Sequence, residues 1–125
     1  MPKTTVHVVV RGVKGREGRM RLALFAAPDG FPGEVERAVR RMHAPIDADS
    51  VVFVIDDVTA GAYAVSILHD ENDDEAMATG AFGRPAEGYG FSRNARGTFG
   101  PPGFDDAAFV VAGEPVDIVI DLIYH

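Results

Sequence analysis

The sequence predicts a mainly β protein, an antiparallel two-layer β-sandwich of about seven strands with one short crossover helix. Three observations lead to this fold class. Apolar residues recur at every second position along most of the chain, as in strands with one buried face. One segment alone has helical spacing. The 125 residues show no internal repeat and no interdomain linker, so residues 1–125 are expected to form a single domain.

The period-two segments place the strands in order along the chain. The first two, residues 6–11 and 20–24, are expected to pair as a hairpin through the glycine-containing connection 12–18. One or two short strands are expected between residues 82 and 94. The remaining predicted strands cover residues 51–55, 63–67, 107–111 and 116–124.

The exception to the alternating pattern predicts a helix over residues 33–43. Four apolar residues there follow the spacing i, i+3, i+4, i+7, which is the stripe of a short amphipathic helix. They are Val35, Ala38, Val39 and Met42. A helix of two to three turns is marginal in isolation, so this one is expected to dock its stripe on the sheet or across one end of the sandwich.

The composition excludes several classes of protein. The chain has no cysteine, and therefore no disulfide, thiolate metal site or catalytic cysteine. It contains no apolar run of about 18 residues, so no membrane span is predicted. The first residues indicate a strand and not a signal peptide.

Charge is distributed unevenly along the chain. Residues 1–41 contain nine Lys or Arg against four acidic residues, whereas the rest contains three against fifteen. The formal net charge of −7 argues against general nucleic-acid binding, which depends on neutralising phosphates. A solvated surface with mixed patches accounts for the asymmetry without any function.

An acidic cluster at residues 70–75 contains the pattern D-x-N-x-D. In calcium loops this spacing brings hard oxygen ligands around one ion, so Asp70, Asn72 and Asp74 are candidate calcium ligands. The sixth position, normally glycine, is Glu75, and the usual glutamate at the twelfth position is absent. The alternative is a solvated acidic turn without a metal.

His69 immediately precedes the acidic cluster. It shares the parity of Tyr63 and Ile67, so its side chain is expected to point toward the end of the core. One interpretation is a hydrogen-bonded structural histidine. The other is a general base or metal ligand, with Asp70 or Glu87 as the partner of a hydrolase dyad.

Residues 80–104 form a long segment in which aromatic residues alternate with glycines and prolines. Long irregular segments are usually functional or disordered, and aromatic rings need burial or a ligand. In one interpretation the rings plug one end of the sandwich. In the other, residues of this segment line a groove for a protein, peptide or carbohydrate ligand. The candidate ligand-binding residues are His69, Glu87, Tyr89, Arg93 and Asn94.

Three motifs carry a family resemblance that spans nearly the whole chain. They are GAYAVSILHDEN, FGRPAEGYGFS and PPGFDDAAFVV, and they resemble the bacterial family called domain of unknown function 2141. The matching residues are Gly61, Tyr63, Ala64, His69, Asp70 and Asn72; Gly83, Pro85, Glu87, Gly88, Tyr89, Gly90, Phe91 and Ser92; and Pro102, Phe104, Ala107 and Phe109.

The resemblance implies an immunoglobulin- or transthyretin-like sandwich that is exported, hence periplasmic or secreted. No activity is established for the family. One departure concerns the acidic loop, which in the family is similar to D-x-N-x-N-G-x-x-D. Here Glu75 stands in place of the glycine and Ala78 in place of the last aspartate. If that loop binds calcium in relatives, this chain is expected to have weakened or lost the site.

Three functional hypotheses follow from the sequence. The first is a non-enzymatic, extracytoplasmic binding module that uses the surface of residues 69–104, with no cofactor. The second is a calcium-stabilised structural module centred on the acidic loop. The third is a hydrolase that uses His69 with Asp70 or Glu87.

Overall fold

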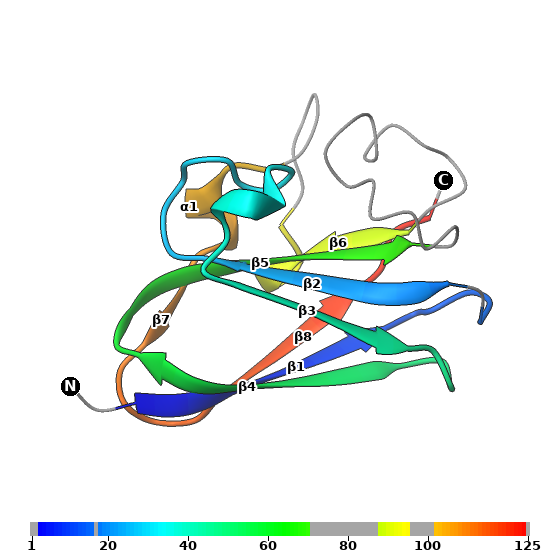
Figure 1. The fold of residues 1–125 in the computed structure, drawn as a ribbon, viewed down its shortest axis with the longest axis horizontal. Helices are drawn as coiled ribbons and strands as arrows, with labels where there is room; N and C mark the ends of the chain where they lie inside the picture. The colour runs from blue at the N-terminus through cyan, green and yellow to red at the C-terminus, as the bar shows by residue number, and fades with distance from the viewer. Residues whose placement is uncertain (1–2, 17, 71–87, 96–101, 125) are drawn as a thin grey trace.

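The protein folds as two β-sheets packed face to face (Figure 1). The structure is a computed structural model, which describes residues 3–16, 18–70, 88–95 and 102–124. Its elements are β1 (Lys3–Arg11), β2 (Arg19–Phe25), η1 (Val35–Arg37), β3 (Arg40–Pro45), β4 (Val51–Thr59), β5 (Gly61–Asp70), β6 (Tyr89–Phe91), η3 (Ser92–Asn94), α1 (Phe104–Ala107), β7 (Phe109–Val111) and β8 (Val116–Asp121).

The two layers differ in size. The three-stranded sheet has the strand order β4–β1–β8, and the five-stranded sheet has the order β3–β2–β5–β6, with β7 also paired to β5. All pairs are antiparallel except β1 with β8, which is parallel. The predicted class, a mainly β sandwich, is therefore confirmed.

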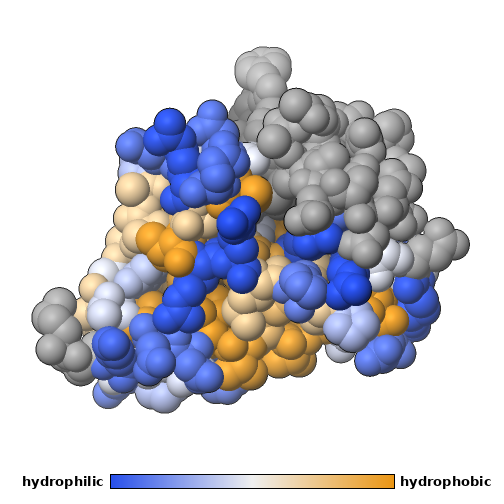
Figure 2. Space-filling view, viewed as in Figure 1, coloured by the Kyte–Doolittle hydropathy of each residue, from blue (hydrophilic) through white to orange (hydrophobic). Residues whose placement is uncertain are grey.

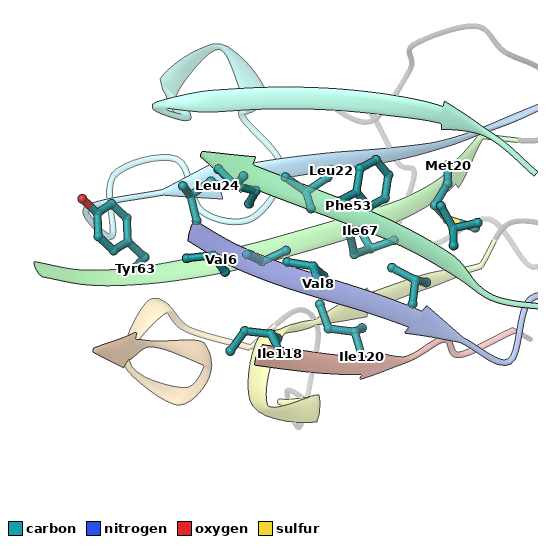
Figure 3. Close-up of a cluster of buried hydrophobic side chains, with 14 of the residues drawn as sticks. Val6, Val8, Met20, Leu22, Leu24, Phe53, Tyr63, Ile67, Ile118 and Ile120 are labelled. Atoms are coloured by element: carbon teal, nitrogen blue, oxygen red, sulfur yellow. The ribbon is translucent and has the colours of Figure 1, made fainter. Parts of the chain in front are cut away.

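The core lies between the sheets and is built by the alternation that the sequence predicts. Val6, Val8 and Val10 of β1 are all fully buried, and Ile120 of β8 is buried beside them. Leu22 of β2 faces them from the other layer, together with its neighbours on β5 (Figure 3). Successive side chains of a strand point to opposite faces, so every second residue enters this one core.

The predicted hairpin between the first two strands is wrong. β1 pairs with β4 and β8 in the three-stranded sheet, whereas β2 belongs to the five-stranded sheet. Residues 12–16 instead begin a connection that carries the chain from one layer to the other. Gly12 and Gly15 have φ angles of 76° and 86° there, which glycine adopts without strain. Because β1 has partners on both edges, β2 has no edge of β1 left to pair with.

The predicted helix over residues 33–43 is also wrong. The structure has a single 3₁₀ turn, η1, followed by the strand β3. Val39, which belongs to the predicted stripe, is 54% exposed, while Met42 and Ala44 alternate inward against the core. Pairing with the free edge of β2 supplies backbone hydrogen bonds and burial that a marginal isolated helix could not match.

A second apolar cluster covers the outer face of the five-stranded sheet, the face turned away from the other layer. Phe31 makes edge-to-face contacts with Phe25, Phe91 and Phe104, with ring centroids 5.2, 6.0 and 6.0 Å apart. The helix α1 lies over this face (Figure 1). Phe91 and Phe104 belong to the described part of segment 80–104. Their rings pack on a sheet face and do not plug an end of the sandwich.

Candidate functional site

His69 forms a buried junction at the end of β5. Its side chain has no exposed surface, and its Nδ1 lies 2.6 Å from the Tyr124 hydroxyl. The same hydroxyl accepts a hydrogen bond of 3.1 Å from the backbone N–H of Lys14, and the His69 backbone N–H donates to the Gly88 carbonyl over 2.8 Å. The junction thus ties together the β1–β2 connection, the end of β5 and the C-terminal residues.

Gly88 leaves room for the ring of this junction. A Cβ at position 88 would lie 2.5 Å from Cζ of Tyr124, a ring held by His69 and Lys14. Gly88→Ala is therefore expected to cost about 1–3 kcal/mol of unfolding free energy through overpacking, measured by urea denaturation. Gly103→Ala is the matched control, since its Cβ would meet only an Asp106 oxygen at 3.8 Å. Equal stability of the two variants would contradict the tight junction.

Asp70 is held by Arg21 in a buried ion pair. The Arg21 Nε donates to Asp70 Oδ2 over 2.8 Å, and the two side chains are 20% and 0% exposed. Asp70 follows His69 in the same strand, so the two side chains point to opposite faces of the sheet. A hydrolase dyad of His69 with Asp70 is therefore wrong; Glu87, the other candidate partner, lies outside the described residues.

The calcium hypothesis stays a prediction. Asn72 and Asp74 lie outside the described residues, and the carboxylate of Asp70 is engaged by Arg21. Within residues 3–16, 18–70, 88–95 and 102–124, no three His, Asp or Glu side chains come together as a metal site would require.

The described members of the predicted ligand set do not converge on one surface. His69 faces the core, whereas Tyr89 pairs with Leu68 on the outer face and lies 5.8 Å from the Phe91 ring. Arg93 and Asn94 form a left-handed turn with φ angles of 61° and 51°. Of these four residues, only Tyr89 packs in the second apolar cluster, and the turn of Arg93 and Asn94 lies against β8.

Asn94 docks on β8 through Asp121. Its side-chain oxygen accepts the Asp121 backbone N–H over 2.9 Å, and Asp121 also receives two hydrogen bonds from Arg11, of 2.8 and 3.1 Å. The Arg11 hydrogen bonds hold the pKa of Asp121 below its usual value. A cavity of about 110 Å³ beside Asn94 and Asp121 is too small for an organic ligand. The contacts among Asn94, Asp121 and Arg11 are consequently structural.

A larger hollow, which we call the basic hollow, lies on the outer face of the five-stranded sheet over β2 and β3. Its volume is about 340 Å³. Hydrophilic side chains gather over β3 and η1 on this face (Figure 2). The residues that line the basic hollow are Arg21, Leu22, Ala23, Val35, Arg41, Met42 and His43.

Strand register explains how the basic hollow forms. Arg21 stands directly across from His43, and Ala23 directly across from Arg41, so all four side chains share one face. Sequence reasoning missed this site because residues 33–43 had the spacing of a helix. The available signal was the concentration of basic residues in the first 41 positions.

The fold and the basic hollow define a β-sandwich protein with an open, positively lined hollow on one sheet. The chain belongs to the family described as "uncharacterized protein conserved in bacteria (DUF2141)", whose model matches residues 8–119. No curated protein and no solved structure matches the chain. In the described part of the chain, no helix is long and apolar enough to cross a membrane.

Proposed function

We infer that this chain is a non-enzymatic ligand-binding module, an immunoglobulin- or transthyretin-like sandwich that acts in the periplasm or after secretion. The single observation that carries the binding role is the basic hollow, an open volume of about 340 Å³ on the outer face of the five-stranded sheet. That volume lies in the range typical of small-ligand pockets. The layers of three and five strands support the sandwich class, and the periplasmic or secreted location is what the family resemblance of the sequence motifs implies.

The polar residues buried in the sandwich support binding over catalysis. The two buried serines, Ser66 and Ser92, bond to backbone atoms of Pro32, Ala107 and Val65. His69 and Asp70 are likewise engaged by Tyr124 and Arg21. A nucleophile and its base must lie within hydrogen-bonding reach of each other, and these side chains make other bonds instead.

The test is thermal unfolding of the full chain with a panel of neutral sugars, amino acids, organic acids and phosphate esters. A ligand at a hundredfold its dissociation constant stabilises the fold by about 2.7 kcal/mol, so at least one class should raise Tm by several degrees. Val35→Trp, which fills the basic hollow, should abolish the shift. The ligand should be recovered chemically unchanged. No shift with any class, or an equal shift for the filled variant, would contradict the proposal.

A further inference from the structure

The basic hollow exists because one small side chain stands among larger ones. Ala23 contributes only a methyl group to the floor, between Arg21 on its own strand and Arg41 across on β3. Val35 of η1 adds an apolar wall. The result is a short apolar floor and wall flanked by cationic side chains.

The positive charge of the basic hollow is not neutralised by its lining. Arg41 is exposed, and its guanidinium makes no hydrogen bond or ion pair within the part of the chain that the structure describes. None of the lining residues is acidic. Two acidic groups of the neighbouring segments have partners of their own, because Asp70 is paired with Arg21 and Glu34 with Arg37. An arginine without a counter-ion beside a hollow attracts an anion.

His43 adds a hydrogen-bond donor to the same lining. Its Nδ1 lies 3.0 Å from a guanidinium nitrogen of Arg19. Arginine is always protonated and can only donate, so Nδ1 must be the acceptor. With Nδ1 accepting, Nε2 carries the ring proton, so His43 offers a hydrogen-bond donor.

We propose that the basic hollow binds a small organic anion, a carboxylate or a phosphate monoester with a short apolar body, and that Arg41 is its anchor. This deepens the proposed function and rests on it. A guanidinium presents parallel N–H donors that match carboxylate and phosphate oxygens. The apolar body of the ligand lies against Ala23 and Val35. A bare inorganic ion would leave most of the 340 Å³ unfilled.

A nucleic acid fits the same cations less well. Nucleic-acid binding requires basic side chains that track a backbone over several phosphates, on a protein whose overall field attracts it. Here the cations converge on one hollow, and the formal net charge of the chain is −7. The short-range fork of Arg41 is therefore matched to a single anionic group.

The experiment is calorimetric titration of the full chain with four probes: benzoate, phenyl phosphate, benzamide and inorganic phosphate. Benzamide has the shape of benzoate without its charge. We expect benzoate or phenyl phosphate to bind at least roughly tenfold more tightly than benzamide and inorganic phosphate. A roughly tenfold difference in affinity corresponds to the free energy of one charge-assisted hydrogen bond. The tighter of the two organic anions identifies carboxylate or phosphate as the ligand group.

Variants locate the contact. Arg41→Gln should weaken binding of the organic anion by roughly tenfold, and Arg41→Lys should weaken it less, because the charge stays and the fork is lost. Lys3→Gln removes one positive charge from β1 in the other sheet and should leave affinity unchanged within about twofold. Arg21 is avoided because its loss would remove the ion pair that it forms with the buried Asp70 carboxylate and would disturb folding.

Three results would overturn the anion assignment. Benzamide could bind as tightly as benzoate, or Arg41→Gln could leave binding of the organic anion intact. Lys3→Gln could also weaken binding as much as Arg41→Gln does, which would mean that the overall electrostatic field of the protein, and not a contact with Arg41, attracts the anion. If a neutral sugar or amino acid binds in the basic hollow while both organic anions fail, the anion assignment falls and the binding module stands. If no class of ligand binds, both fall.

Discussion

Replacing Arg21 with methionine is expected to reduce the unfolding free energy by about 3 kcal/mol or more in urea denaturation. Arg21 donates from Nε to Asp70 over 2.8 Å, and the Asp70 side chain has no exposed surface. Removing the cation takes the Arg21 ion pair away from a fully buried carboxylate, which costs more than the pair itself contributes. Methionine keeps the apolar stem and removes only the charged fork.

A second ion pair gives the matched control for Arg21. Arg16 contacts Asp49 over 2.7 Å, but those side chains are 47% and 88% exposed. Arg16→Met should therefore cost at most about 0.5–1 kcal/mol of unfolding free energy when both variants are compared by urea denaturation. The double variant Arg21→Met/Asp70→Leu should recover much of the loss, because no buried charge remains. Equal losses for Arg21→Met and Arg16→Met would contradict a buried pair.

Ser92→Ala is expected to cost about 2–4 kcal/mol, because it leaves two buried backbone groups without partners. The Ser92 hydroxyl donates to the Ala107 carbonyl over 2.6 Å and accepts the Val65 backbone N–H over 2.9 Å. It thereby joins the central strand β5, the turn after β6 and the helix α1. Alanine supplies neither bond, and the buried site limits replacement by water.

Ser66 is the matched control for Ser92, since it is equally buried on the same outer face. Its hydroxyl makes one longer bond, of 3.3 Å, to the Pro32 carbonyl. Ser66→Ala should cost about 1 kcal/mol by urea denaturation. Proton exchange should also be faster at the Val65 amide in the Ser92 variant. If the two alanine variants lose the same stability, the two-bond role of Ser92 is wrong.

The predicted effects at Arg21 and Arg41 separate stability from binding. The two side chains line the same basic hollow, yet Arg21 is committed to the buried Asp70 and Arg41 is exposed. Arg21 should therefore act mainly on folding and Arg41 mainly on the ligand. This division makes it possible to test the binding role in a protein that stays folded.

The spacing of apolar residues was enough to predict which side chains form the main core. Val6, Val8 and Val10 follow strict alternation, and all three are buried. The same parity predicts that His69 faces the core end, where it meets Tyr124. Alternation is a local property of an extended chain, so it can be read without knowing which strand lies next to which.

The sequence of this protein by itself determined its class, a β-sandwich whose alternate residues share one core. Only the tertiary structure decided that β1 and β2 lie in different sheets, that residues 40–45 form an edge strand, and that arginines from β2 and β3 border one hollow. Strand partners are selected by long-range competition for free edges and burial, which no short window of sequence contains. The stripe at residues 35–42 fitted a helix locally, but the free edge of β2 offered more hydrogen bonds and more buried surface.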